Sequence, residues 1–140
     1  MKYALYFVDT NVFIYRTQKQ SPYYEECKKF LDLALMGEIS ITTSVETLQE
    51  VVHVFRRTKQ NSLGIRVAKL ILEQNTDLLE INAGIIEKFV VLAEKYPRSD
   101  SRDLLRVAAC SYNGIRPIIT LDKDFKSYKE VVAMSPSEIK

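Results

Sequence analysis

Two short apolar runs in this chain end directly in aspartate. Residues 6–8 are followed by Asp9, and residues 118–121 are followed by Asp122. A single aspartate after a strand often does no more than cap the next helix. Two such residues on parallel strands would lie at the same edge of a sheet, where folds of this class bind ligands. The pattern therefore indicates a site that brings carboxylates together.

A third carboxylate is expected from the helix that follows the second predicted strand. Thr43 and Glu46 fit a capping box, with Thr43 as the cap and Glu46 at the third helical position. That pairing gives Glu46 a structural role at the start of the helix. Glu50 has no such role and lies on the face opposite the apolar stripe, so it is either a solvated surface charge or a site residue.

A fourth carboxylate, Asp103, lies at the start of the last long helix. Asp100 or Ser101 can cap that helix, which leaves Asp103 one turn further in. An acidic residue in a first turn is also stabilised by the helix dipole alone. Facing the strand ends is the alternative, and the two readings stay open at this point.

Together these residues indicate a metal centre. Asp9, Glu50, Asp103 and Asp122 would converge at one sheet edge, where they cannot all stay ionised without raised pKa values or a cation. The chain has one histidine and two cysteines, so the ligands are oxygen atoms, which suit hard ions such as Mg²⁺ or Mn²⁺. Such ions activate water in phosphodiester hydrolysis.

The elements that must position these residues follow from hydrophobic periodicity. Short apolar runs, most of them β-branched, predict five strands, at residues 3–8, 38–42, 77–81, 117–121 and 131–134. Helical stripes lie between them, and alternating strands and helices indicate an α/β fold with a parallel sheet, formed by a single domain over residues 1–140. We assign to the core the stripe residues Tyr23, Cys27, Phe30, Leu31, Ala34, Leu48, Val51, Val52, Phe55, Leu63, Val67, Leu70, Ile71, Ile86, Phe89, Val90, Ala93, Leu104, Leu105, Ala108, Ala109 and Tyr112.

Composition narrows the class of protein without identifying a substrate. The net charge of +2 permits nucleic-acid binding but does not argue for it. Cys27 and Cys110 lie among apolar residues, which predicts two buried thiols in a reducing compartment. No apolar run is long enough for a membrane helix, so we expect a cytoplasmic protein without membrane contact.

Four stretches in this order resemble the PIN-domain family, and within it the VapC-type toxin ribonucleases. They are FVDTN at 7–11, TSVETLQEVVHVFRR at 43–57, RDLLRVAA at 102–109 and IITLDKDF at 118–125. The resemblance spans nearly the whole chain. It implies a three-layer α/β/α sandwich with a parallel five-stranded sheet in the order 3-2-1-4-5.

The resemblance also implies an activity and a site. The family's four acidic positions fall on Asp9, Glu50, Asp103 and Asp122, with Asp9 and Asp103 as the principal metal ligands. Asp124 remains a rival to Asp122, and Asp100 a rival to Asp103. Supporting polar positions fall on Thr10, Asn11 and Thr120. A Mg²⁺- or Mn²⁺-dependent endoribonuclease that leaves a 5′-phosphate is implied, usually a homodimer inhibited by a small antitoxin protein.

Arginines near the site are candidates for contacts to RNA phosphates, although an ordinary surface charge is the alternative for each. They are Arg16, Arg98, Arg102 and Arg106. A phosphatase of the haloacid-dehalogenase type would need aspartate where the chain has Asn11. The single histidine, His53, excludes a ribonuclease that uses a histidine pair. A non-catalytic RNA- or partner-binding module of the same fold remains the alternative function.

Overall fold

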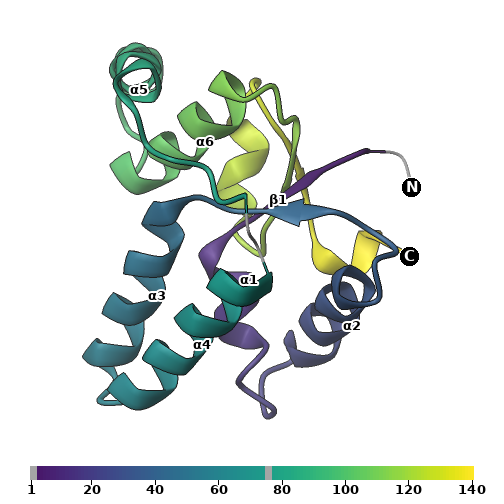
Figure 1. Cartoon of the computed structure of the whole chain (residues 1–140). Helices are drawn as coiled ribbons and strands as arrows, with labels where there is room; N and C mark the ends of the chain where they lie inside the picture. The colour runs from purple at the N-terminus through teal and green to yellow at the C-terminus, as the bar shows by residue number, and fades with distance from the viewer. Residues whose placement is uncertain (1–2, 75–76) are drawn as a thin grey trace.

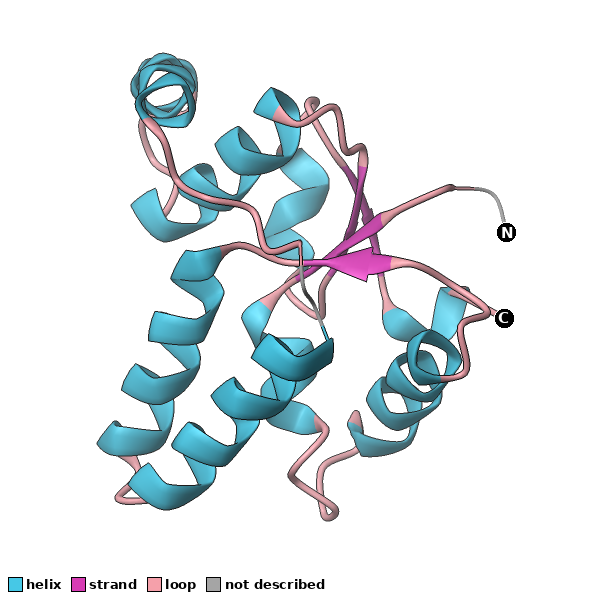
Figure 2. Ribbon diagram, in the orientation of Figure 1, coloured by secondary structure: helices cyan, strands magenta, loops and turns pink. Residues whose placement is uncertain are grey.

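The computed structural model describes residues 3–74 and 77–140. Its centre is a parallel sheet of four strands in the order β2-β1-β3-β4 (Figures 1 and 2). Each of these strands lies within a predicted run but is shorter than predicted. The bounds are β1 Tyr6–Val8, β2 Ile41–Thr42, β3 Pro117–Ile119 and β4 Val132–Met134.

The predicted strand at residues 77–81 does not form, so the five-stranded sheet is a wrong prediction. That segment makes one isolated parallel bridge, between Leu79 and Ser44. Two backbone hydrogen bonds flank it, from Val45 to Leu79 and from Leu79 to Thr43. The neighbouring strand ends at Thr42 and a helix begins at Val45, so little extended chain is left to pair with. The four strands that form keep the order implied by the resemblance.

Helices fill the connections between the strands. They are α1 Thr10–Tyr15, α2 Tyr24–Leu35, α3 Val45–Arg57, α4 Asn61–Gln74, α5 Ala83–Lys95 and α6 Ser101–Tyr112, with short 3₁₀ turns η1 Lys123–Ser127 and η2 Pro136–Glu138. Gly37 and Gly114 follow α2 and α6 with φ of 76° and 67°. Glycine adopts this left-handed conformation without strain and so ends both helices.

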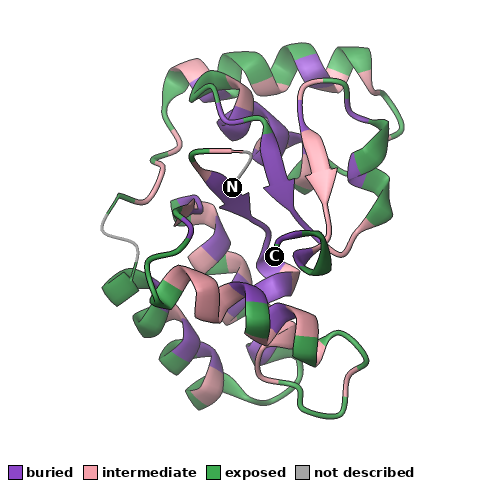
Figure 3. Cartoon of the chain, turned by 90° about the vertical axis from the view of Figure 1, so that its right-hand side faces the viewer, coloured by how far each residue is buried: buried purple, intermediate pink, exposed green. Residues whose placement is uncertain are grey.

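Two cores on opposite faces of the sheet make the structure a three-layer α/β/α sandwich. Successive residues of a strand point to opposite faces. Tyr6 and Val8 accordingly pack with α1 to α4, whereas Phe7 packs with α5 and α6. The central strands β1 and β3 are fully buried, and the outer faces of the helices are exposed (Figure 3).

Most of the predicted core residues lie in these clusters, but six do not: Val52 is half-buried outside both clusters, and the other five are exposed. Exposed fractions of 41–50% are found for Tyr23, Leu70, Ile86, Val90 and Tyr112. On α5 the buried residues are Ile85 and Leu92, so the inward face is rotated by one position from the predicted stripe. Periodicity identifies the helix, but an all-apolar stretch such as Ile85-Ile86 does not show which residue points inward.

The other predictions about single residues have clear outcomes. Cys27 and Cys110 are buried free thiols, as predicted. His53 is exposed on α3. None of the helices in the described residues has the length and apolar character needed to cross a bilayer.

Candidate metal centre at the carboxyl edge of the sheet

Asp9 ends β1 and is held by a dense set of hydrogen bonds. Its side chain caps α1 by accepting from the Thr10 amide at 2.8 Å. The Thr120 hydroxyl donates to the Asp9 carboxylate at 2.7 Å, and the Asn11 side-chain amide donates to it at 3.2 Å. The carboxylate is nearly fully buried, and that burial raises its pKa, whereas the Arg106 guanidinium opposes the rise. The predicted supporting residues therefore do surround Asp9.

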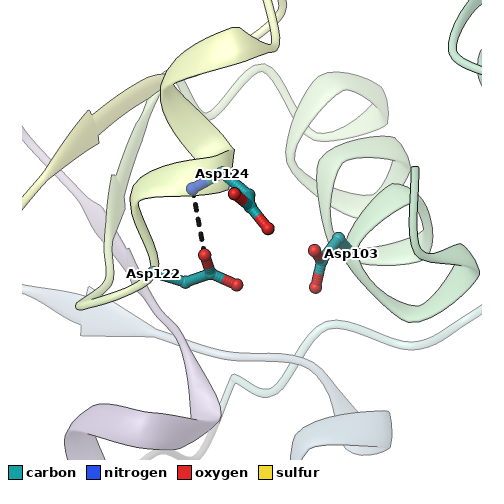
Figure 4. A group of neighbouring side chains, drawn as sticks. All are labelled: Asp103, Asp122 and Asp124. Atoms are coloured by element: carbon teal, nitrogen blue, oxygen red, sulfur yellow. Dashed lines mark hydrogen bonds between the residues drawn. The ribbon is translucent and has the colours of Figure 1, made fainter. Parts of the chain in front are cut away.

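Asp103, Asp122 and Asp124 form a carboxylate cluster beside it. One oxygen from each lies within 4.8 Å of the others. Asp103 from α6 faces the two residues of the β3–η1 segment (Figure 4). Asp122 also caps η1, because its Oδ1 accepts from the Asp124 amide at 2.9 Å. The sequence left capping and a role in the site as alternatives for Asp122, and in the structure its carboxylate both caps η1 and lies in the cluster.

Burial and neighbouring negative charges both act on the carboxylates of this cluster. Burial, followed by the charges of Asp122 and Asp100, raises the pKa of Asp103 to about 7. Three converging carboxylate oxygens are the donor set that hard divalent ions take. These residues therefore fit a divalent cation.

The rivalry between Asp100 and Asp103 is decided by position. Asp100 is the N-cap of α6 and accepts from the Arg102 amide at 2.8 Å. Its carboxylate also pairs with the Arg102 side chain at 3.3 Å, and these hydrogen bonds lower the pKa of Asp100. Asp103 is the residue turned into the cluster. For Asp122 and Asp124 the structure makes no such choice, because both belong to the cluster.

Glu50 reaches the same edge from α3 through an arginine. Its Oε1 lies 3.3 Å from the exposed Arg102 guanidinium, and its side chain is 13% exposed. Of the arginines predicted to contact RNA, Arg102 therefore lies at the rim of this edge, exposed beside Glu50. Arg16 instead contacts Tyr24, with its guanidinium carbon 5.6 Å from the ring centre.

Arg106 and Glu46 were misjudged from the sequence. Arg106 is not a surface charge, since its side chain is 7% exposed and lies among carboxylates. The predicted capping box of Glu46 is wrong: the cap is Ser44 without a side-chain hydrogen bond, and the Thr43 hydroxyl donates to the Val8 carbonyl. For Arg106, the spacing along the helix could have indicated its position. Arg106 follows Asp103 by three residues and therefore shares its helix face.

Comparisons with known proteins agree with this geometry. A sequence profile described as "PIN domain" matches residues 6–131. The chain is 29% identical to Ribonuclease VapC23 of Mycobacterium tuberculosis over 121 residues. The aligned stretch covers 86% of this chain and 95% of that relative.

Two solved structures share the fold. One is VapBC2 from Rickettsia felis bound to a DNA fragment from its promoter, with a TM-score of 0.73 and 16% identity over 94% of this chain and 98% of that one. The other is the Mycobacterium tuberculosis toxin VapC20, described as cleaving the sarcin–ricin loop. It has a TM-score of 0.71 and 18% identity over 90% of this chain and 98% of that one.

Proposed function

Because this chain belongs to the PIN-domain family, we propose that it is a metal-dependent endoribonuclease and the toxin of a toxin–antitoxin pair. The observation that carries the proposal is the cluster of Asp103, Asp122 and Asp124 beside the buried Asp9. The names of its relatives support the substrate class, since the matched curated proteins are called VapC ribonucleases. The substrate is therefore RNA.

Mg²⁺ or Mn²⁺ is the proposed cofactor. Asp103 and Asp9 are the principal ligands, and Glu50 and Asp122 complete the site directly or through water, with Asp124 as a rival to Asp122. When bound, such an ion supplies an acidified water and stabilises charge on the departing 3′ oxygen.

The surrounding residues have orienting roles in this proposal. Thr120 and Asn11 donate to Asp9, which fixes the direction of its carboxylate. The Thr120 hydroxyl also accepts from the Asp122 backbone amide at 3.0 Å, so one side chain holds both the Asp9 carboxylate and the backbone of Asp122. Arg102 is exposed at the rim and is the proposed contact to an RNA phosphate.

The direct test is cleavage of a mixed RNA pool by the full chain with Mn²⁺, compared with EDTA and with Asp9→Asn. We expect EDTA to stop cleavage and Asp9→Asn to slow it at least about a hundredfold, because a buried acidic group of the metal centre is lost. Asp32→Asn is the matched control, since Asp32 pairs with Lys28 on α2, away from the cluster.

Full activity in Asp9→Asn would refute the assignment of the site. Absence of cleavage by folded, Mn²⁺-loaded protein over a broad RNA pool would favour the alternative, a non-catalytic binding module of this fold.

The proposed protein partners are a small antitoxin and a second copy of the chain. The antitoxin is supported by the VapBC complexes among the similar structures. The homodimer is supported by apolar residues left in solvent on α5, where Val90 and Val91 are 50% and 64% exposed. Sedimentation of the purified chain tests the homodimer, and a monomer at all concentrations contradicts it.

A further inference from the structure

A buried arginine lies between three of the acidic residues. Arg106 Nε is 3.2 Å from Asp9 Oδ1, its NH2 group 3.5 Å from Glu46 Oε1, and its NH1 group 3.5 Å from Asp103 Oδ1. The NH2 group also donates to the Thr10 hydroxyl at 3.2 Å. The guanidinium is therefore the local counter-charge of Asp9.

This arrangement leaves two polar atoms without hydrogen bonds. Within the described part of the chain, neither Arg106 Nε nor Glu46 Oε2 has a hydrogen-bond partner, although both atoms are buried. The Nε–Asp9 contact is thus close in distance but poorly directed. A buried polar atom without a partner costs about 1–3 kcal/mol, so an arrangement that paired these two atoms would remove that cost.

A divalent ion and this guanidinium would compete for the same carboxylate. Both are cations, and Arg106 lies 3.2 Å from Asp9 and 3.5 Å from Asp103 of the carboxylate cluster, so it already sits beside the place where the ion would bind. Two cations within a few ångströms in a buried site repel strongly. One of them must find another anion, and Glu46 is the anion already in contact with Arg106.

We propose that Arg106 is a positioning residue, an internal cation that occupies Asp9 in the metal-free protein and shifts to Glu46 when a divalent ion takes Asp9. Glu46 is then the receiving carboxylate, with Oε2 as the unused acceptor. The inference rests on the proposed metal centre, but not on RNA cleavage. It explains why a glutamate outside the predicted acidic set points at this edge.

The test is a double-mutant cycle on Mn²⁺ affinity, measured by isothermal titration calorimetry on the full chain. Arg106→Met removes the competing cation and is expected to tighten Mn²⁺ binding about tenfold. Glu46→Gln keeps Arg106 on Asp9 and is expected to weaken binding about tenfold. In the double variant the Glu46 substitution should change affinity less than about twofold, because its effect passes through Arg106.

Two outcomes overturn the inference. An equal loss of affinity from Glu46→Gln in both backgrounds means that Glu46 acts on the ion directly. Weaker Mn²⁺ binding by Arg106→Met means that the arginine organises the site and does not compete for it. Arg57→Met is the matched control, because Arg57 is exposed at the far end of α3, and it should leave affinity unchanged.

The design keeps the inference separate from the proposed function. Circular dichroism in EDTA first checks that each variant folds, and Arg106→Gln, which retains hydrogen-bond donors, replaces Arg106→Met if the latter does not. Mn²⁺ binding with an additive cycle overturns only the inference. A coupled cycle without RNA cleavage overturns only the nuclease, and no Mn²⁺ binding by the unaltered protein overturns both.

Discussion

The metal-free protein should lose stability as pH rises from 5 to 8. The pKa of Asp103 is raised to about 7 from an ordinary value of 3.8, mainly by burial and then by Asp122. The folded state therefore binds a proton that the unfolded state has released above pH 4. Linkage then requires that this stability is present at low pH and is lost as pH rises through about 7.

The magnitude follows from the size of the shift. A shift of this size, taken whole, corresponds to about 4 kcal/mol. Asp103 keeps 13% of its side chain exposed, and solvent and salt screen the repulsion, so we expect a loss of about 1–3 kcal/mol. Raised pKa values of Asp9 and Glu46 act in the same direction.

Urea unfolding in EDTA, at constant ionic strength and at half-unit steps of pH, measures the slope of the free energy of unfolding against pH. Asp103→Asn should flatten it and raise the free energy of unfolding at pH 8, whereas the control Asp32→Asn should keep the slope of the unaltered protein. Stability that is constant or rises between pH 5 and 8, or an unchanged slope in Asp103→Asn, would refute the reasoning.

Two further predictions concern packing and the fourth carboxylate. A Cβ at Gly64 would lie 2.7 Å from Phe55 Cβ in the buried α3–α4 contact, so Gly64→Ala should lower the free energy of unfolding by about 1–2 kcal/mol despite its better helix propensity. Gly84→Ala meets only an exposed tyrosine ring that can turn away and should not lower thermal stability; equal losses in both would contradict this account. Asp122→Asn keeps the cap on η1 but removes a half-buried charge, so calorimetry should show a loss of Mn²⁺ affinity at least about tenfold larger than in Asp124→Asn, and the reverse order would make Asp124 the ligand.

Much of the fold was predictable because it depends on local patterns. The strands at β1, β3 and β4 follow from short apolar runs of β-branched or aromatic residues, and α2 ends where Gly37 allows a positive φ. The segment at residues 77–81 shows the limit of such patterns. It has the composition of a strand, but pairing needs an extended neighbour, and Thr43 and Ser44 already lead into α3.

The site residues also divide into those that local patterns identify and those that only packing reveals. Asp9 and Asp122 could be identified because each directly follows an apolar run of strand type, and parallel strands bring their carboxyl ends to one edge. Asp103 needed the further fact that Asp100 takes the cap of α6. The exposed positions on α5 show that a helix with adjacent apolar residues does not reveal its inward face without the partner that packs on it.

By itself, the sequence determined the α/β class, the positions of the four strands that form and the edge of the sheet at which carboxylates gather, because hydrophobic period and strand ends are local properties of the chain. Only the tertiary structure decided that Asp124 joins the cluster, that Asp100 does not, and that Arg106 is buried against Asp9 and Glu46. These are contacts between side chains on separate elements. Their direction depends on how α3 and α6 dock at the edge of the sheet, and no local pattern specifies that docking.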